Sequence, residues 1–272
     1  MVINLSLKYY LVRNKVISEN DEYIHKSGKH KNFPSLRYYF KSMKTVFESY
    51  LLAKKGLYSS IAWENASLNM LKACENAGAD VFYKGMANLK KVIPPSVFIS
   101  NHMSTLETFL LPAIINPIVT TTYIMKKELV EMPIFGKVVK AINPIVVGRS
   151  NPKADLMTVI KESEALLKNG KSIIVFPQKT RSSYLDKKSF NTIGVKIAAK
   201  NNVPIVPIAV LTNALNNGKI IKDFGKFDNT KPIIIEIGEP FEPTGNGKID
   251  NAKVIEFIEN KFIEWGKKDF VK

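Results

Sequence analysis

The sequence predicts an α/β fold: a single domain with a central, mostly parallel or mixed β-sheet flanked by helices, plus an N-terminal amphipathic helical hairpin. Two observations lead to this prediction. From about residue 96 onward, short runs rich in β-branched residues alternate with segments of helical periodicity, and such alternation is typical of a sheet covered by helices. The chain of 272 residues is 45% hydrophobic, which suffices for one sizeable core and excludes a disordered chain.

The predicted strands are short apolar runs bounded by polar or turn residues. They are residues 96–100, 120–125, 145–147, 172–176, 205–210 and 233–237. The predicted helices have apolar residues at helical spacing, over residues 105–115, 127–140, 154–168, 191–200 and 250–265. Asn169-Gly170 and Asn217-Gly218 are predicted turns, and the first ends the helix before the strand at residue 172.

The N-terminal part predicts two helices, at about residues 36–51 and 58–76. The apolar residues of the first fall within an arc of roughly 140°: Leu36, Tyr39, Phe40, Met43, Val46, Phe47, Tyr50 and Leu51. Such a face either packs on the core of the domain or lies in a membrane interface. We therefore divide the chain into a basic N-terminal segment with the hairpin (residues 1–80), a possible membrane dock, and an α/β domain (residues 81–272).

The charge of the chain favours an anionic partner. Forty Lys and Arg residues against 24 Asp and Glu residues give a net charge of +16. Nucleic acid, a phosphate-bearing substrate and an anionic membrane surface all fit such a charge, and so does the composition of a lysine-rich proteome. The single cysteine, Cys74, permits no intrachain disulfide and is predicted to be a small core residue. We expect no signal peptide and no membrane span.

Four polar stretches follow predicted strands directly. They are SNHMSTLE (100–107), KKELVEMP (126–133), VVGRS (146–150) and FPQKTRSS (176–183). Ligand sites of α/β sheets gather at the carboxyl ends of the strands. The sequence therefore predicts a site where these stretches meet.

His102 and Glu107 in the first stretch are separated by five positions, which is not a helical spacing. If a helix begins near Ser104, a glutamate in its first turn can reach back to a histidine just outside it. Glu107 would then orient His102 as a general base. Alternatively, Ser104 and Glu107 form a capping box and the histidine is incidental. Ser104 is a possible nucleophile, but a helix cap is the favoured interpretation, because no second histidine lies nearby.

The stretches occur in the order of known motifs. SNHMSTLET resembles the NHxSxxD block (HX4D/E) of the glycerolipid acyltransferases, the family of bacterial 1-acyl-sn-glycerol-3-phosphate acyltransferases. Residues 126–149 resemble its second block, which ends on an arginine; residues 175–182 its FPEGTRS block; and residues 203–208 its VPIVPV block. The resemblance covers roughly residues 96–210. Two departures are Glu107 in place of aspartate and Gln178-Lys179 in place of Glu-Gly.

The resemblance implies an enzyme of phospholipid biosynthesis, a 1-acylglycerol-3-phosphate O-acyltransferase. It would move a fatty acyl group from acyl-carrier protein or acyl-CoA to the 2-hydroxyl of the lysophosphatidic acid 1-acyl-sn-glycerol-3-phosphate, giving phosphatidic acid. His102 and Glu107 would be catalytic, and no metal or cofactor is expected. The expected substrate-binding residues are Lys126, Arg149, Gln178, Lys179, Thr180, Arg181 and Ser182.

The expected partners follow from this reaction: a lysophospholipid acceptor, the acyl donor and an anionic membrane surface. The expected location is cytoplasmic, peripheral on the inner face of the cell membrane. No nucleic acid is expected, because the chain has no RNA-binding aromatic signature and no zinc-finger motif. The alternatives are acylation of glycerol 3-phosphate or another lysolipid, or a non-catalytic protein that binds lipid or nucleic acid.

Overall fold

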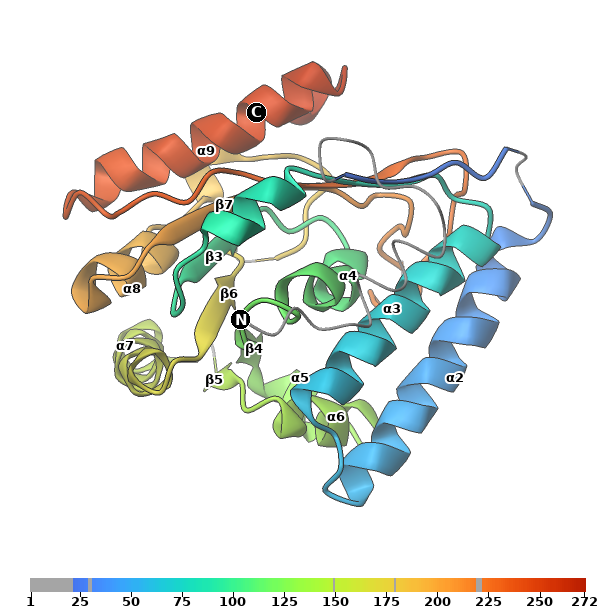
Figure 1. Cartoon of the computed structure of the whole chain (residues 1–272), viewed down its shortest axis with the longest axis horizontal. Helices are drawn as coiled ribbons and strands as arrows, with labels where there is room; N and C mark the ends of the chain where they lie inside the picture. The colour runs from blue at the N-terminus through green and yellow to red at the C-terminus, as the bar shows by residue number, and fades with distance from the viewer. Residues whose placement is uncertain (1–21, 29–30, 149, 179, 219–221) are drawn as a thin grey trace.

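The computed structural model describes residues 22–28, 31–148, 150–178, 180–218 and 222–272. Within these residues, eight strands form one mixed sheet in the order β1-β2-β8-β7-β3-β6-β4-β5. Figure 1 labels five of them, β7, β3, β6, β4 and β5. Strands β7, β3, β6, β4 and β5 are parallel neighbours, β8 is antiparallel to β7, and β2 is parallel to β8. β1 closes the other edge antiparallel to β2. The predicted single α/β domain with a mixed sheet is confirmed.

The strands are β1 (Tyr23–His25), β2 (Val81–Lys84), β3 (Val97–Ser100), β4 (Thr121–Lys126), β5 (Ile145–Val147), β6 (Ser172–Val175), β7 (Ile205–Leu211) and β8 (Ile233–Ile237). All six predicted strands are present within a residue or so of their predicted ends. β1 and β2 were not predicted; their runs, YIH and VFYK, each end on a basic residue, unlike the equally short runs IVV and SIIV that were predicted. The division at residue 80 stays a prediction; β1, from the N-terminal side of it, completes the sheet.

The helices are α2 (Pro34–Lys54), α3 (Ser60–Asn76), α4 (Leu106–Ile115), α5 (Lys127–Glu131), α6 (Phe135–Ala141), α7 (Pro152–Lys168), α8 (Ile193–Asn201) and α9 (Gly247–Glu264). Short 3-10 turns lie at η1 (Met86–Lys91), η2 (Lys187–Ser189) and η3 (Lys268–Phe270). The single helix predicted over residues 127–140 is wrong, since α5 and α6 divide it. Pro133 holds Met132 in an extended conformation (φ −60°, ψ 138°) and ends α5.

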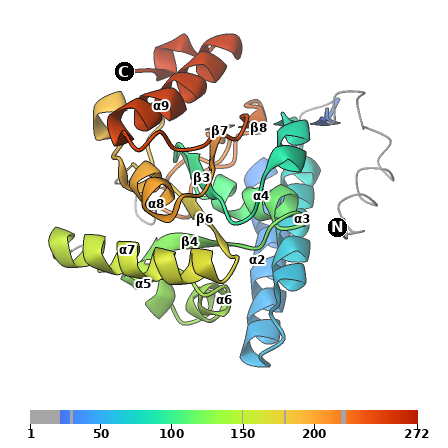
Figure 2. The same ribbon diagram turned by 60° about the vertical axis from the view of Figure 1, so that its left-hand side comes forward.

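The helices cover both faces of the sheet. Figure 2 shows α7, α8 and α9 on one side, and α4 with α3 and α2 on the other. Two buried tyrosines fix α4 against its face: the hydroxyls of Tyr83 (β2) and Tyr123 (β4) donate to carbonyls of α4 at 3.3 and 3.1 Å. β3 lies between β6 and β7 with all four of its residues buried. The loop from β3 to α4 therefore lies over the middle of the sheet.

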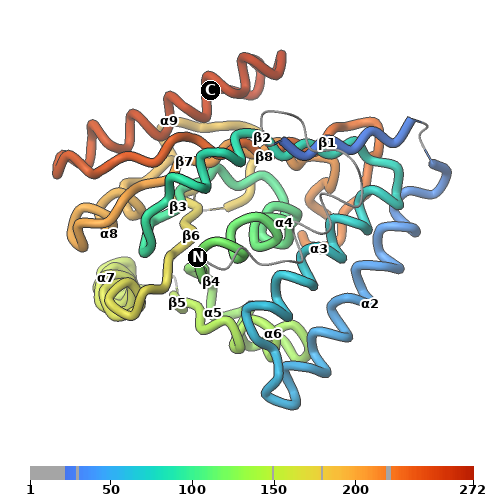
Figure 3. The backbone as a smooth tube through the Cα atoms, viewed as in Figure 1, coloured from blue at the N-terminus to red at the C-terminus, as the bar shows by residue number. Residues whose placement is uncertain are grey.

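The N-terminal hairpin turns its apolar face outward. α2 runs beside α3 along the outer edge of the fold (Figure 3), and the side chains that it buries are Tyr38, Ser42, Thr45 and Ser49. Five residues of the predicted apolar arc are exposed: Leu36, Phe40, Met43, Phe47 and Leu51, at 41–75% of their surface. Only Tyr39, Val46 and Tyr50 of that arc pack against the core.

Two further expectations concern the interior and the membrane. Cys74 is fully buried in α3, as predicted. Over the described ranges, every helix is too short or too polar to cross a membrane.

Candidate active site

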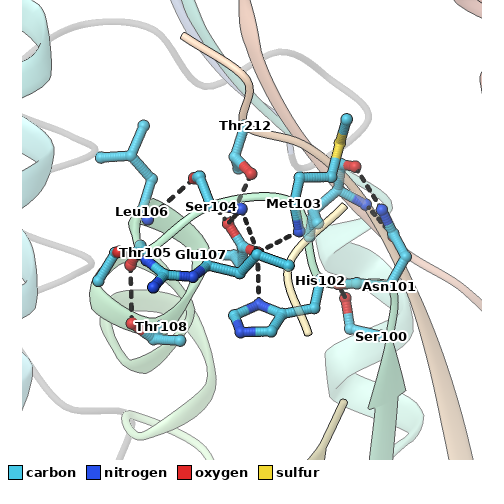
Figure 4. Close-up of polar contacts among 12 residues, drawn as sticks. Ser100, Asn101, His102, Met103, Ser104, Thr105, Leu106, Glu107, Thr108 and Thr212 are labelled. Atoms are coloured by element: carbon cyan, nitrogen blue, oxygen red, sulfur yellow. Dashed lines mark hydrogen bonds and ion pairs between the residues drawn. The ribbon is translucent and has the colours of Figure 1, made fainter. Parts of the chain in front are cut away.

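His102 lies in the loop between β3 and α4 (Figure 4). Hydrogen bonds hold its backbone from two directions. Its N–H donates to Oε1 of Gln178 at 2.7 Å, and its carbonyl accepts from the N–H of Ser182 at 2.9 Å. The preceding residue, Asn101, exchanges two 2.9 Å hydrogen bonds with the backbone of Val210 in β7. The loop is therefore fixed to the ends of both strands that flank β3.

The His102 ring meets Glu107 across the start of α4. The helix begins at Leu106, one residue later than the predicted span of 105–115, so Glu107 lies in its first turn and reaches back to the loop. Nδ1 of His102 is 2.8 Å from Oε1 of Glu107. The histidine side chain keeps 19% of its surface exposed while the glutamate side chain is fully buried. No described residue is hydrogen-bonded to Nε2, which is the nitrogen left for a substrate.

Glu107 accepts from five donors: His102, the N–H groups of Met103 (2.6 Å) and Ser104 (2.9 Å), the Ser104 hydroxyl (3.0 Å) and the Thr212 hydroxyl (2.5 Å). Burial by itself raises the pKa of Glu107, but the hydrogen bond and charge of His102, the Thr212 hydroxyl and the backbone together outweigh it. The pKa therefore lies below its usual value of 4.5. The carboxylate is held as an anion beside the imidazole.

The capping and orienting interpretations of Glu107 are both satisfied by the same carboxylate. Ser104 completes the cap, because its hydroxyl accepts from the N–H of Leu106 at 3.0 Å. The whole residue is buried, with 1% of its surface exposed. This is the capping role predicted for Ser104. Glu107 binds both the first-turn backbone and the histidine, so the geometry does not force a choice between them.

Two residues that the sequence did not single out, Phe176 and Thr212, contact the His102–Glu107 pair. Phe176 stacks under the His102 ring with centroids 4.4 Å apart and planes 20° apart, and Tyr123 stacks on Phe176 in turn. Thr212 follows β7 directly and reaches Glu107 across 105 positions of sequence. A polar residue at the carboxyl end of a strand was the available signal for Thr212, the same signal that pointed to His102.

Comparison with known proteins gives a matching family model and several relatives. A family model described as Acyltransferase matches residues 80–211. This match and the relatives below support the glycerolipid acyltransferase family that the motif blocks resemble. It is 32% identical to the 1-acyl-sn-glycerol-3-phosphate acyltransferase of Pseudomonas aeruginosa over 133 residues, 49% of this chain and 50% of that one. It is 32% identical to the enzyme of the same name from Saccharomyces cerevisiae over 185 residues, 67% of this chain and 57% of that one.

A solved structure shares the fold. The crystal structure of the 1-acyl-sn-glycerophosphate (LPA) acyltransferase from Thermotoga maritima matches with a TM-score of 0.63 at 23% identity, covering 86% of this chain and 95% of that one. The chain spans about half the length of the curated relatives it matches.

The FPEGTRS-like block lies beside the His102–Glu107 pair. Arg181 has 14% of its side chain exposed; its Nη1 donates to Oδ1 of Asp223 at 2.8 Å and also to the hydroxyl of Thr105. Thr180 is exposed, and Ser182 is half-buried, with its hydroxyl accepting from the N–H of Tyr184 at 3.1 Å. Asp223 was not predicted, because it lies outside the motif blocks.

The other predicted substrate-binding residues are placed differently or lie outside the described residues. Gln178 is 4% exposed and uses its amide within the protein, accepting from His102 and donating to the carbonyl of Tyr184 at 3.4 Å. Lys126 ends β4 and caps α5, half-buried. Arg149 and Lys179 lie outside the described residues.

A small apolar cavity of about 50 Å³ lies between the hairpin, α4, β4 and α6. Aromatic and aliphatic side chains dominate its lining, which includes Trp63, Phe109, Tyr123, Phe135 and Val139. Tyr123 belongs both to this lining and to the stack beneath His102. The apolar lining therefore extends to the ring stack beneath His102.

Proposed function

We propose that this chain is a 1-acyl-sn-glycerol-3-phosphate acyltransferase, which moves a fatty acyl group from acyl-carrier protein or acyl-CoA to the 2-hydroxyl of its acceptor. The observation that carries the proposal is the 2.8 Å pairing of His102 with a buried anionic Glu107, which leaves Nε2 open. The names of the Pseudomonas aeruginosa and Saccharomyces cerevisiae relatives support the choice of acceptor. The product would be phosphatidic acid.

In the proposed reaction, Nε2 of His102 takes the proton of the acceptor hydroxyl as its oxygen attacks the thioester carbonyl. A C–O bond forms, the carbonyl becomes tetrahedral, and the C–S bond then breaks. The leaving thiolate takes the proton back from the imidazolium. Glu107 stays ionised and stabilises that imidazolium, a contribution of about 10²–10⁴ in rate for general-base help of this kind. We propose that neither an acyl-enzyme nor a metal or cofactor takes part.

We propose that Arg181 binds the acceptor phosphate, since a guanidinium can hold two phosphate oxygens at once. Thr180 and Ser182 flank it, and Lys126, Arg149 and Lys179 are the further cationic groups of the proposed site. Gln178 is proposed to act indirectly, because its buried amide fixes the backbone of His102.

We propose that the chain works on an anionic membrane surface, peripherally on the cytoplasmic side. The exposed apolar residues of α2 support this proposal, because burying them in the interface removes a costly apolar surface from water. Exposed basic residues of the same helix, Arg37, Lys41 and Lys44, would meet anionic headgroups.

The test is an acyl-transfer assay with labelled acyl-carrier protein and acyl-CoA against a panel of lysolipids and glycerol 3-phosphate. Transfer to 1-acyl-sn-glycerol-3-phosphate that His102→Ala lowers by about 10²-fold or more is expected. Preferred transfer to another acceptor would contradict the proposed substrate. No transfer to any acceptor, or full activity of His102→Ala, would contradict the mechanism.

A further inference from the structure

Arg181 does not stand alone at the proposed phosphate site. Its Nη1 donates to Oδ1 of Asp223 at 2.8 Å and to the hydroxyl of Thr105, and that hydroxyl donates to the same carboxylate oxygen at 3.2 Å. We propose that Asp223 is a positioning residue that aims the guanidinium of Arg181 at the acceptor phosphate. This inference rests on the proposed function of the site.

The contacts of Arg181 use only one part of its guanidinium. Among the described residues, each of its side-chain hydrogen bonds comes from Nη1, including a long one of 3.5 Å to the carbonyl of Lys222. A guanidinium carries five N–H donors in a rigid plane. Nε and Nη2 together remain for a phosphate, and they form the edge that binds two oxygens side by side.

The same contacts fix Arg181 relative to the catalytic histidine. Thr105 directly precedes α4, and Glu107 lies in the first turn of that helix. The residue after Arg181, Ser182, donates its N–H to the carbonyl of His102 at 2.9 Å. A phosphate held by Arg181 would therefore be held at a set position from the general base, and such positioning is a large part of catalysis.

Asp223 is itself held from two sides by the connection between β7 and β8. On the side of the active site, the Asn217 amide donates to the carbonyl of Met103 at 3.1 Å. On the side of the hairpin, the Tyr39 hydroxyl of α2 donates to the carbonyl of Gly225 at 2.7 Å, and its ring stacks on Phe224. The two residues that follow Asp223 are therefore anchored to α2, and the Asp223 side chain is 35% exposed against 14% for Arg181.

An ion pair that only held the loop would contribute little to the stability of the fold, because partly exposed ion pairs are weak. A pair that aims Arg181 predicts a specific kinetic effect: removing the carboxylate weakens the binding of the acceptor and leaves the chemistry and the donor site unchanged. A positioning role of Asp223 therefore changes the KM for the acceptor and leaves the kcat and the KM for the donor unchanged, whereas a role in holding the loop does not single out the acceptor.

The experiment compares wild type with Asp223→Ala and Asp223→Asn in steady-state acyl transfer, with acceptor and donor varied separately. Asp223→Ala is expected to raise the KM for 1-acyl-sn-glycerol-3-phosphate about tenfold, the effect of losing one charge-assisted hydrogen bond. The kcat and the donor KM should stay within about twofold. Asp223→Asn should lie between wild type and Asp223→Ala, because its amide oxygen still accepts from Nη1.

Asp228→Asn is the matched control. Asp228 lies on the same connection, but its carboxylate binds Thr230 and lies 3.6 Å from Lys231, away from the proposed phosphate site. It should leave the acceptor KM unchanged. Melting temperatures of all variants separate an effect on folding from an effect on the site.

An unchanged or lower acceptor KM in Asp223→Ala would overturn the inference. Equal increases in the KM for acceptor and donor, together with a lowered melting temperature, would also overturn it. Calorimetric binding of a water-soluble short-chain 1-acyl-sn-glycerol-3-phosphate, without donor, gives the same comparison without turnover. Weaker binding by Asp223→Ala supports the inference, and equal or tighter binding refutes it. Absence of transfer by wild type contradicts the proposed function alone, since the binding comparison still decides the role of Asp223.

Discussion

The substitution Thr212→Val removes one donor from Glu107 with almost no change of shape. Both residues are fully buried, and the Thr212 hydroxyl lies 2.5 Å from Oε2. The described partners left to Oε2 are the N–H of Ser104 at 3.2 Å and its hydroxyl at 3.0 Å. A hydrogen bond to a charged group contributes about 1.5–3 kcal/mol. The free energy of unfolding at neutral pH should therefore fall by about 2 kcal/mol, and the pKa of Glu107 should rise.

The pH dependence of this loss has a definite sign. The folded-state pKa of Glu107 lies below its ordinary value of 4.5, so the carboxylate stabilises the fold above that value. Its contribution is lost as the pH falls through the folded-state pKa. Because Thr212→Val raises that pKa, the variant loses the contribution at a higher pH. The difference in unfolding free energy between the two proteins should be largest at neutral pH and shrink at low pH.

Denaturant unfolding at neutral pH and below the ordinary carboxyl pKa measures this difference. Thr212→Ser is the matched control, since it keeps the hydroxyl and removes only a methyl group. We expect the kcat of Thr212→Val to fall about three- to tenfold, because Glu107 still pairs with His102. Unchanged stability at neutral pH, or the same deficit at both pH values, would refute the reasoning.

Two further predictions concern Ser104 and α2. Ser104→Ala should lower the free energy of unfolding by about 1–2 kcal/mol, since it removes the cap of Leu106. It should retain acyl transfer well above the level of the histidine variant, and an equally inactive Ser104→Ala would reinstate it as a nucleophile. Phe40→Ser with Phe47→Ser should weaken sedimentation with anionic vesicles without lowering the melting temperature, because both rings are exposed. Ile249→Ser on α9, also exposed, is the control; equal sedimentation of both variants would contradict docking through α2.

The local pattern of apolar residues was sufficient to predict most of the helices and strands. Six strands and the principal helices appear where the sequence places them, because period-2 and period-3.6 burial are properties of consecutive residues. The failure at α5 and α6 has a local cause too. The apolar spacing over residues 127–140 is helical throughout, but the backbone restriction of Pro133 divides the segment into α5 and α6.

The sequence by itself determined the fold class and the order of the motifs. It showed that Glu107 could reach His102 across a helix start, but it left open whether Glu107 pairs with the histidine or only caps the helix; the structure shows that it does both. Only the tertiary structure decided which face of α2 is buried, since the periodicity of a helix defines an apolar face but not its partner. It also decided the surroundings of the pair. Thr212 and Asp223 reach Glu107 and Arg181 from 105 and 42 positions away, and contacts at such separations depend on how the strands are ordered in the sheet.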